Sequence, residues 1–531
     1  VAPRMLGHHR VGRRTATTRQ AAMVAALAPR WLRAAAAQAL PFVLLVLLLL
    51  LAPGAAEPAE GRHSVEEALR FYADQCAHPP VPQRASVPGP LPQEDLEAHG
   101  LEFAGLHVIF RHGARTMMHD PFACFSPDFA SRLLSRCDVR AGDVYAWPGE
   151  GSEAVDAPPL LKKYRGIYEP TAAGANAVAQ SGLGCGPDQL LDEAILQFDA
   201  LGQAIRENYF SRLSKEPTLN STSLYSTDTT RTLASTYALQ RALFGAGNAH
   251  REHKAELGSV ETRPESVDAW ARRSPCPGAE ATLQAAHEAQ PPTDVGEIEL
   301  HRRWLATFGK PFSSKCHDPI MVAHCSGKLP PDQGINASSL LGEAIAADYW
   351  RKRSMYLRSK EAWTLLVAPA WLELQDFARR QAAGSEPRTL AFWATHDTVI
   401  TPMLVALGAW DGTWPHYTEA IVLELYRSRE KPGTAYVRLL RRGRSLEVPS
   451  CQPVGPLGLC DLERLLPPAV SKQRDPQLRL QLCSPPPAAA STSATATAAE
   501  AAAIAELRPP GSPPCVAPSA AAVAAAAAVA L

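Results

Sequence analysis

The stretch VIFRHGART, residues 108–116, places Arg111, His112 and Arg115 directly behind an unbroken apolar run. Such a run is typical of a strand buried on both faces, as the strands of parallel sheets are. In open α/β sheets, ligands bind beyond the carboxyl ends of the strands. We therefore expect these three side chains at the rim of a sheet, where a ligand can reach them.

The flanking sequence predicts the rest of an α/β fold. Two further buried strands are expected at SLYS, residues 223–226, and at TLAFWAT, residues 389–395. Helical periodicity covers residues 189–210 and 228–245. Residues 419–440, with a Pro-Gly turn in the middle, predict two antiparallel strands at an edge of the sheet. The expected fold is α/β, a mostly parallel sheet with flanking helices.

Composition divides the chain into segments. Residues 101–485 form the expected main domain, and the polar, proline-interrupted range 246–388 within it predicts an inserted, mainly helical cap subdomain. Residues 57–100, rich in proline, glutamine and charge, are interpreted as a lead-in segment. Residues 486–531 are a low-complexity Ala/Pro/Ser/Thr tail that has no reason to fold.

Residues 1–56 have the three parts of a secretory signal. Arg30 and Arg33 supply positive charge, Phe42–Ala52 is a short apolar core, and small residues near Ala56 offer a cleavage site. The core is shorter than the roughly 20 residues of a spanning helix, which favours a cleaved signal peptide over an uncut membrane anchor. Both alternatives predict the secretory pathway: the protein is secreted, lysosomal or vacuolar, or anchored with its main domain outside the cytosol.

The cysteines and two glycosylation motifs fit export. All 11 cysteines follow the signal, and in an oxidising compartment most should pair. Their spacing makes Cys451–Cys460 a plausible local disulfide and leaves Cys515 in the tail unpaired. Asn220 and Asn336 lie in N-glycosylation motifs.

The charge balance restricts the class of partner. The chain has 53 basic and 53 acidic side chains, so its formal net charge is zero. Nucleic-acid binders normally carry a basic excess, and this class is disfavoured. Any anion site must therefore be local, with a few arginines brought into one pocket.

The residue types of the opening stretch suit phosphoryl transfer. Guanidinium groups bind phosphate oxygens in a bidentate way and stay charged at any working pH. A histidine between two arginines makes sense if its imidazole attacks the phosphorus that they hold. The alternative is an exposed basic turn. We predict that His112 is the nucleophile and that Arg111 and Arg115 bind the phosphate.

Protonation of the leaving alcohol needs an acid, which a His-Asp pair could supply. Three such pairs occur, at residues 119–120, 317–318 and 396–397. The first two have the character of turns beside proline. The third ends an apolar strand and opens a helical run, which repeats the context of the first site. We predict Asp397 as the general acid and His396 as a phosphate ligand.

A third junction between a strand and a helix contains Arg231. It falls in the first helical turn after the strand in LYSTDTTRTLAS, residues 224–235. There its guanidinium and the helix N-terminus could face the same anion. We predict Arg231 as a further phosphate ligand, in preference to a solvated surface residue.

These motifs resemble the histidine acid phosphatases of the lysosomal and prostatic type. The resemblance rests on VIFRHGAR, STDTTRT, the helix around Gln197 and THDT, in that order along the chain. The long insert between Met117 and Cys185 is similar to that of the divergent 2-phosphoxylose phosphatase-like branch. Membership would imply the α/β fold of the phosphoglycerate mutases and acid phosphatases with a helical cap, a phosphohistidine intermediate, and no metal or cofactor. Some relatives form homodimers, so this state stays open here.

The sequence thus predicts an exported acid phosphatase that hydrolyses small phosphate monoesters. One alternative is a catalytically silent glycoprotein of the same fold, which the complete set of site residues disfavours. Another is an inositol-polyphosphate or phytase-like phosphatase. The inositol-polyphosphate branch has His-Ala-Glu where this chain has His396 and Asp397, which weakens that alternative. No nucleic acid is expected as a partner, and membrane contact is expected only through the N-terminal segment.

Overall fold

The computed structural model describes eight stretches of the chain. They are residues 64–73, 87–133, 188–244, 260–263, 268–271, 276–288, 295–452 and 455–484. The predicted signal segment, the low-complexity tail and four of the cysteines, Cys76, Cys137, Cys185 and Cys515, lie outside the described residues.

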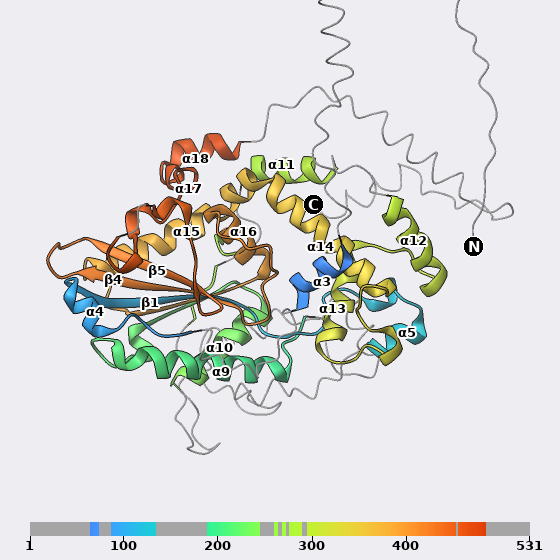
Figure 1. Cartoon of the computed structure of the whole chain (residues 1–531), viewed down its shortest axis with the longest axis horizontal. Coiled ribbons are helices and arrows are strands. Elements are labelled where there is room, and N and C mark those ends of the chain that lie inside the picture. The colour runs from blue at the N-terminus through green and yellow to red at the C-terminus, as the bar shows by residue number, and fades with distance from the viewer. Residues whose placement is uncertain are drawn as a thin grey trace, which may run out of the picture. The chain divides into compact units, whose positions relative to one another are not determined.

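A mixed sheet forms the centre of the main domain (Figure 1). Its strands follow the order β2-β3-β1-β4-β5-β6, and β7 pairs with β5. The parallel part consists of β1 (Leu101–Arg111), β2 (Thr222–Ser226) and β3 (Leu390–Thr395), with β3 in the middle. These are the three strands expected from the apolar runs, and they are confirmed.

The other part of the sheet is antiparallel. Strand β4 (Ala420–Ser428) pairs with β1, and β5 (Ala435–Arg441) pairs with β4, which confirms the predicted hairpin. The short strands β6 (Arg444–Ser445) and β7 (Cys460–Asp461) both pair with β5. The antiparallel part is larger than expected, because two-residue strands carry no apolar pattern that a sequence could show.

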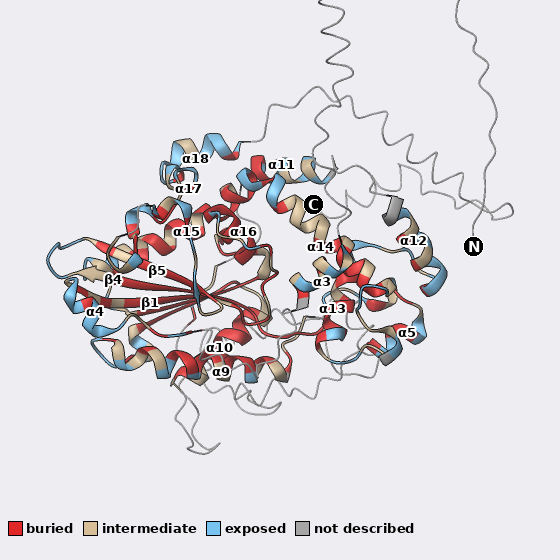
Figure 2. Cartoon of the chain, viewed as in Figure 1, coloured by how far each residue is buried: buried red, intermediate tan, exposed pale blue. Residues whose placement is uncertain are grey.

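Helices cover both faces of the sheet (Figures 1 and 2). Helices α9 (Asp192–Tyr209) and α10 (Thr230–Phe244) cover one face, in agreement with the predicted periodicity. Helices α15 (Lys360–Ala382) and α16 (Asp397–Leu407) cover the other. Side chains alternate across β1, so neighbouring residues enter different cores and the strand must be apolar on both faces.

A second group of helices packs around its own apolar cluster beside the sheet. Its members are α3 (Val65–Ala73), α5 (Pro127–Leu133), α11 (Pro277–Glu288), α12 (Val295–Phe308), α13 (His317–Cys325) and α14 (Leu340–Arg358). Four of these fall in the range 246–388, but α15 of the same range packs on the sheet. The cap boundaries therefore stay a prediction. Helix α3 lies in the range interpreted as lead-in, and its Ala68 and Tyr72 are buried in this cluster.

Short elements complete the fold. The remaining α-helices are α4 (Gln93–Ala98), α17 (Pro468–Ser471) and α18 (Pro476–Cys483). Single 3-10 turns are η3 (Pro121–Ala123), η4 (Phe210–Arg212), η5 (Leu219–Ser221), η6 (Ser314–Cys316), η7 (Pro331–Gln333), η8 (Pro449–Cys451), η9 (Pro456–Gly458), η10 (Leu462–Arg464) and η11 (Lys472–Arg474).

Three disulfides join cysteines that both lie in the described residues. They are Cys124–Cys316, Cys276–Cys483 and the predicted Cys451–Cys460. Disulfides of this kind fit an oxidising compartment and thus the secretory pathway. The two asparagines of the glycosylation motifs, Asn220 and Asn336, are exposed, and their modification stays a prediction. None of the helices in the described ranges is long and apolar enough to cross a membrane.

Candidate active site

The predicted site residues gather at the carboxyl ends of the three parallel strands. Arg111 is the last residue of β1, His396 follows β3 directly, and Arg231 lies in the first turn of α10, which follows β2. Because the three strands are parallel neighbours, their carboxyl ends meet at one edge of the sheet. The topology therefore brings together residues that are 120 and more positions apart in sequence.

The turn after β1 is fixed by hydrogen bonds from its backbone. The His112 N–H donates to the Thr395 carbonyl over 3.1 Å, and the Gly113 N–H donates to Ser235 Oγ over 3.1 Å. A Cβ atom at Gly113 would lie 2.4 Å from the Cβ of Ala194 on α9. Only glycine fits there, because a side chain would push the turn away from α9.

The imidazole of His112 is buried and held in one tautomer. Its Nδ1 lies 2.9 Å from the Gly113 carbonyl oxygen. A carbonyl can only accept, so Nδ1 carries the hydrogen and Nε2 carries the free lone pair. Burial, and then the positive charges of Arg231, Arg111 and Arg115, lower the pKa of His112 well below its usual range. The neutral form of the imidazole is therefore favoured.

Asp397, at the start of α16, forms an ion pair with Arg111. Asp397 Oδ2 lies 2.7 Å from Arg111 Nη2 and accepts a hydrogen bond from the indole N–H of Trp414 at 3.1 Å. The backbone N–H of Thr398 donates to Oδ1 over 2.8 Å. Burial would raise the pKa of this carboxyl, but Arg111 and then Lys352 outweigh burial and hold it well below its usual range. Without a ligand, Asp397 is ionised.

His396 is a second neutral imidazole. Its Nδ1 accepts from Arg231 Nη2 at 3.1 Å, because a guanidinium can only donate. Its Nε2 therefore carries the hydrogen and donates to Thr227 Oγ1 over 3.0 Å. Burial and then Arg231 lower the pKa of His396 well below its usual range. The rings of His112 and His396 lie 5.6 Å apart between their centres, so both face the same space.

Two aspartates that the sequence interpretation missed balance the remaining arginines. Arg115 Nη2 lies 2.8 Å from Asp318 Oδ1, and Arg115 Nε lies 3.4 Å from Asp188 Oδ1. Asp188 also forms an ion pair with Arg231. Asp318 belongs to the His-Asp pair at 317–318 that was interpreted as a turn. Its contact with Arg115 spans 203 residues, and no local pattern indicates it.

The loop before β4 forms another wall of the site and was also missed. Arg111 Nη1 donates to the Pro415 carbonyl over 2.7 Å, and the Arg111 guanidinium lies 4.4 Å from the centre of the Tyr417 ring. The loop is anchored by the buried carboxylate of Glu419, which is paired with Arg441 and Arg442. The loop thus fixes the direction of the Arg111 side chain.

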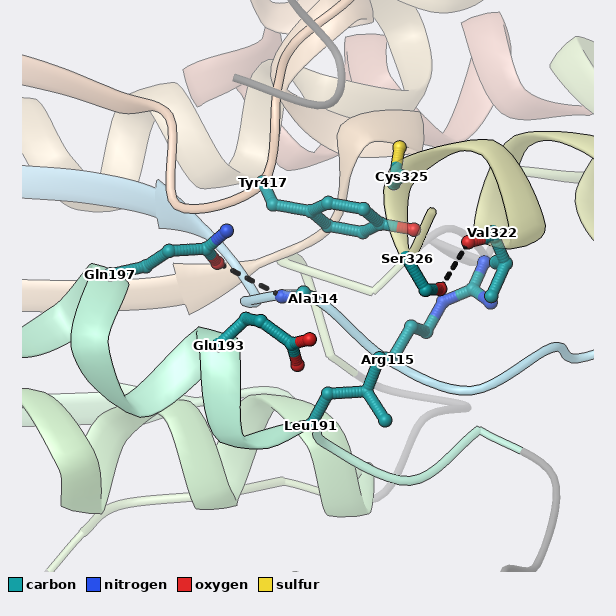
Figure 3. A pocket seen from close by; sticks show the side chains of 9 residues that line it. All are labelled: Ala114, Arg115, Leu191, Glu193, Gln197, Val322, Cys325, Ser326 and Tyr417. Atoms are coloured by element: carbon teal, nitrogen blue, oxygen red, sulfur yellow. Dashed lines mark hydrogen bonds between the residues drawn. The ribbon is translucent and has the colours of Figure 1, made fainter. Parts of the chain in front are cut away.

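A pocket adjoins Arg115 and Tyr417 (Figure 3). About 300 Å³ of space, part of it open to solvent, is lined by Ala114, Arg115, Leu191, Glu193, Gln197, Val322, Cys325, Ser326 and Tyr417. Gln197 Oε1 accepts from the Ala114 N–H at 3.1 Å, which ties α9 to the His112 turn. Within the described ranges, no group of three or more His, Cys, Asp or Glu side chains is placed to hold a metal ion.

All six predicted site residues therefore lie together, and their chemical roles remain predictions. Four of them are almost fully enclosed, Arg111, His112, Arg115 and His396. Buried arginines around an imidazole whose neutral form is favoured have the composition expected of an anion site.

Comparisons with known proteins agree with this geometry. Residues 102–328 match the family model of the histidine phosphatase superfamily (branch 2). Lysophosphatidic acid phosphatase type 6 of Bos taurus is 24% identical over 439 residues, which cover 77% of this chain and 92% of that protein. 2-Phosphoxylose phosphatase 1 of Homo sapiens is 30% identical over 123 residues, 22% of this chain and 25% of that protein.

A solved phytase from Citrobacter braakii aligns over 72% of this chain and 99% of its own, with 11% identity and a TM-score of 0.46. The family match and the curated relatives agree with the motifs on which the resemblance rests. The match of residues 102–328 and the curated relatives confirm the resemblance to the histidine acid phosphatases, branch 2 of the histidine phosphatase superfamily, and support a phosphatase enzyme.

Proposed function

We propose that this phosphatase hydrolyses phosphate monoesters through a phosphohistidine intermediate, with His112 as the nucleophile and Asp397 as the general acid. The observation that carries the proposal is the tautomer of His112. Its Nδ1–H is bound to the Gly113 carbonyl, so the lone pair is on Nε2. Burial, and then the neighbouring guanidinium groups, favour the neutral form of that imidazole by lowering its pKa.

In the first step, Nε2 of His112 attacks phosphorus and a bond from nitrogen to phosphorus forms. The bond from phosphorus to the ester oxygen breaks, and Asp397 gives its proton to the leaving alcohol. Arg111, Arg115 and Arg231 stabilise the charge that develops on the other phosphate oxygens. Nδ1 of His396 carries no hydrogen and accepts from Arg231, so its contact with a phosphate oxygen would require Arg231 to move and Nδ1 to gain a proton.

Asp397 must be protonated for this step, although it is ionised in the ligand-free site. A phosphate group that draws Arg111 away removes the strongest neighbour that lowers the pKa of Asp397. Burial and the negative phosphate then both raise that pKa, so the carboxyl can take up a proton. Substrate binding would thus prepare the acid, most readily at acidic pH.

In the second step, water attacks the phosphorus of phosphohistidine. Asp397, now ionised, takes one proton from that water, the bond from nitrogen to phosphorus breaks, and inorganic phosphate leaves. His112 returns to its neutral tautomer. The cycle consumes one water and regenerates the proton on Asp397.

The silent-glycoprotein alternative is disfavoured, because the chain contains every residue that the two proposed steps need. The compartment, the fate of the N-terminal segment, glycosylation and dimerisation stay proposals as predicted from the sequence. The curated relatives are named for phosphate monoesters of a lipid and of a sugar, which supports a small monoester as the substrate of this chain.

The test is hydrolysis of phenyl phosphate by the purified protein from pH 4 to 8, with a chelator present. We expect activity that is highest in acid and is abolished in His112→Ala. The control His119→Ala should keep its activity, because that residue contacts Asp318 through its backbone N–H. Rapid denaturation in base after mixing with radiolabelled substrate should leave label on the wild-type chain that acid removes, as phosphohistidine requires. Absence of wild-type activity at every pH would refute the proposal.

A further inference from the structure

We infer that the pocket beside Arg115 receives the leaving group of the substrate. We further infer that the negative charge of Glu193 makes the enzyme prefer phosphomonoesters with an uncharged or cationic leaving group. Phosphomonoesters whose leaving group carries a second anionic group are then poorer substrates. This inference rests on the proposed function and adds a substrate class to it.

The pocket is placed to hold what is attached to a bound phosphate. Two of its lining residues, Arg115 and Tyr417, also border the phosphate site: the Tyr417 ring lies 6.0 Å from the His112 ring, between their centres. A third, Ala114, belongs to the turn that carries His112. A phosphoryl group on His112 would therefore have this open space directly next to it.

The lining combines apolar surface with one carboxylate. Leu191, Val322 and the Tyr417 ring supply apolar walls. Figure 3 shows the Glu193 carboxylate directed into the pocket on the side of Arg115. Such a pocket suits a carbon skeleton that bears hydroxyl or amine groups, because a carboxylate accepts hydrogen bonds and attracts positive charge.

The arginines of the site have no charge to spare for a second anion. In the ligand-free site, Arg111 is paired with Asp397, Arg115 with Asp318 and Asp188, and Arg231 with Asp188. Three guanidinium groups thus face three carboxylates before any substrate binds. One phosphate can take the place of carboxylates at these arginines, but it leaves no unpaired cation beside it.

Glu193 adds a further negative charge at the place where a second anionic group would lie. Its side chain is partly buried, and in the described part of the chain no cation forms an ion pair with it. Its charge therefore acts on the pocket, where lower solvation strengthens it. A carboxylate or second phosphate on the leaving group would meet repulsion there, which is discrimination by an unfavourable contact.

The test compares kcat/KM for phenyl phosphate with kcat/KM for 4-carboxyphenyl phosphate. The carboxyl group also changes the acidity of the leaving phenol, but this contribution is the same in every variant. We expect the wild type to prefer phenyl phosphate. In Glu193→Gln, the preference should fall about fivefold, as for the removal of one partly screened charge pair. In Glu193→Lys it should fall further, and inositol hexakisphosphate should become a better substrate.

A matched control is Glu207→Gln, at the exposed end of the same helix, where Glu207 accepts from Gln203 Nε2 at 2.8 Å. The Glu207→Gln variant should prefer phenyl phosphate over 4-carboxyphenyl phosphate as strongly as the wild type does. Added salt should reduce the difference between wild type and Glu193→Gln, because screening weakens the repulsion. An unchanged preference in both Glu193 variants, with phenyl phosphate still hydrolysed, would overturn the inference alone. A wild type that hydrolyses neither substrate would overturn the proposed function together with it.

Discussion

Two His-Asp pairs, at residues 317–318 and 396–397, each give an aspartate to an arginine of the His112 turn, yet they differ in what surrounds them. Asp318 accepts from Arg115 and from the backbone N–H groups of Met118 and His119, at 2.8, 2.6 and 3.1 Å. These donors all belong to one short segment. Because backbone groups cannot be drawn away by a ligand, Asp318 keeps its charge.

The donors to Asp397 come from separate elements. Arg111 ends β1, Trp414 belongs to the loop before β4, and Thr398 lies in α16. A phosphate can compete for Arg111 and leave the other two contacts intact. The comparison teaches that a carboxyl held chiefly by a cation that can also bind the ligand is able to change its protonation, whereas a carboxyl held by several backbone N–H groups keeps a turn in place.

The histidines of the two pairs differ as well. His396 accepts from Arg231 and faces His112. His317 instead lies against Tyr72 and beside Asp348, in the helical cluster. Burial lowers the pKa of His317 to about 4, with Asp348 opposing the effect. The neutral form is therefore favoured for both imidazoles, but only His396 borders the proposed phosphate site.

The largest difference between the pairs should appear in Asp397→Asn. Loss of a general acid costs about 10²–10⁴-fold in rate. We expect that loss in kcat for an alkyl phosphate such as glycerol 2-phosphate, and a much smaller loss for 4-nitrophenyl phosphate, whose leaving group needs little protonation. Steady-state kinetics with both substrates measure it. Equal losses for the two substrates would remove Asp397 from the role of acid.

Asp318→Asn should lower the stability of the protein and weaken phosphate binding. The loss of phosphate binding should be the same for every leaving group. The loss of a hydrogen bond between charged groups predicts about 2 kcal/mol lower stability. Arg115 and the neighbouring backbone donors lower the pKa of Asp318 in the fold, against the opposing effect of burial. The contribution is therefore present above the unfolded pKa, near 4, and is lost as the pH falls through the lower folded value. Denaturant titrations at pH 7 and pH 3 should show the gap between wild type and variant narrowing in acid.

Trp414→Phe should give the smallest effect and sharpen the account of Asp397. The substitution keeps a ring and removes the N–H that favours the ionised carboxyl, so the pKa of Asp397 should rise. The descending limb of the pH profile of kcat should then move to higher pH by roughly one unit. The charged and titratable groups that act on Asp397 together with Trp414 are Arg111, Arg115, Arg231, Lys352, His396, His317, Tyr72 and Tyr417.

Trp410→Phe is the matched control for that shift. The Trp410 indole donates to the Thr413 carbonyl at 3.1 Å in the same loop and has no hydrogen bond with Asp397. In this variant, the descending limb of the pH profile of kcat should stay at the wild-type pH. A limb that moves equally in both variants would mean that the loop as a whole, not the indole N–H of Trp414, sets the protonation of Asp397.

The sequence predicted what depends on local pattern. Apolar runs located β1, β2 and β3, and residue types at their carboxyl ends located His112 and Asp397, because parallel strands bring such ends together. Asp188, Asp318, Trp414 and Tyr417 were missed, since each acts on its arginine or carboxylate through contacts that only the folded topology creates. Asp318 belongs to a His-Asp pair whose neighbouring proline indicates a turn, so its local sequence gives no sign of the contact with Arg115.

The sequence interpretation also missed helix α3, although its apolar residues recur at helical spacing, and this helix has a practical consequence. The Tyr72 ring lies 6.0 Å from the Trp414 ring and 5.1 Å from that of His317, and its hydroxyl donates to Asp348 over 3.4 Å. The earliest helix described in the chain thus supports the residue that touches the proposed acid. A recombinant fragment that starts at the first strand would lack this support. An expression boundary for enzymology should therefore be drawn upstream of Val65.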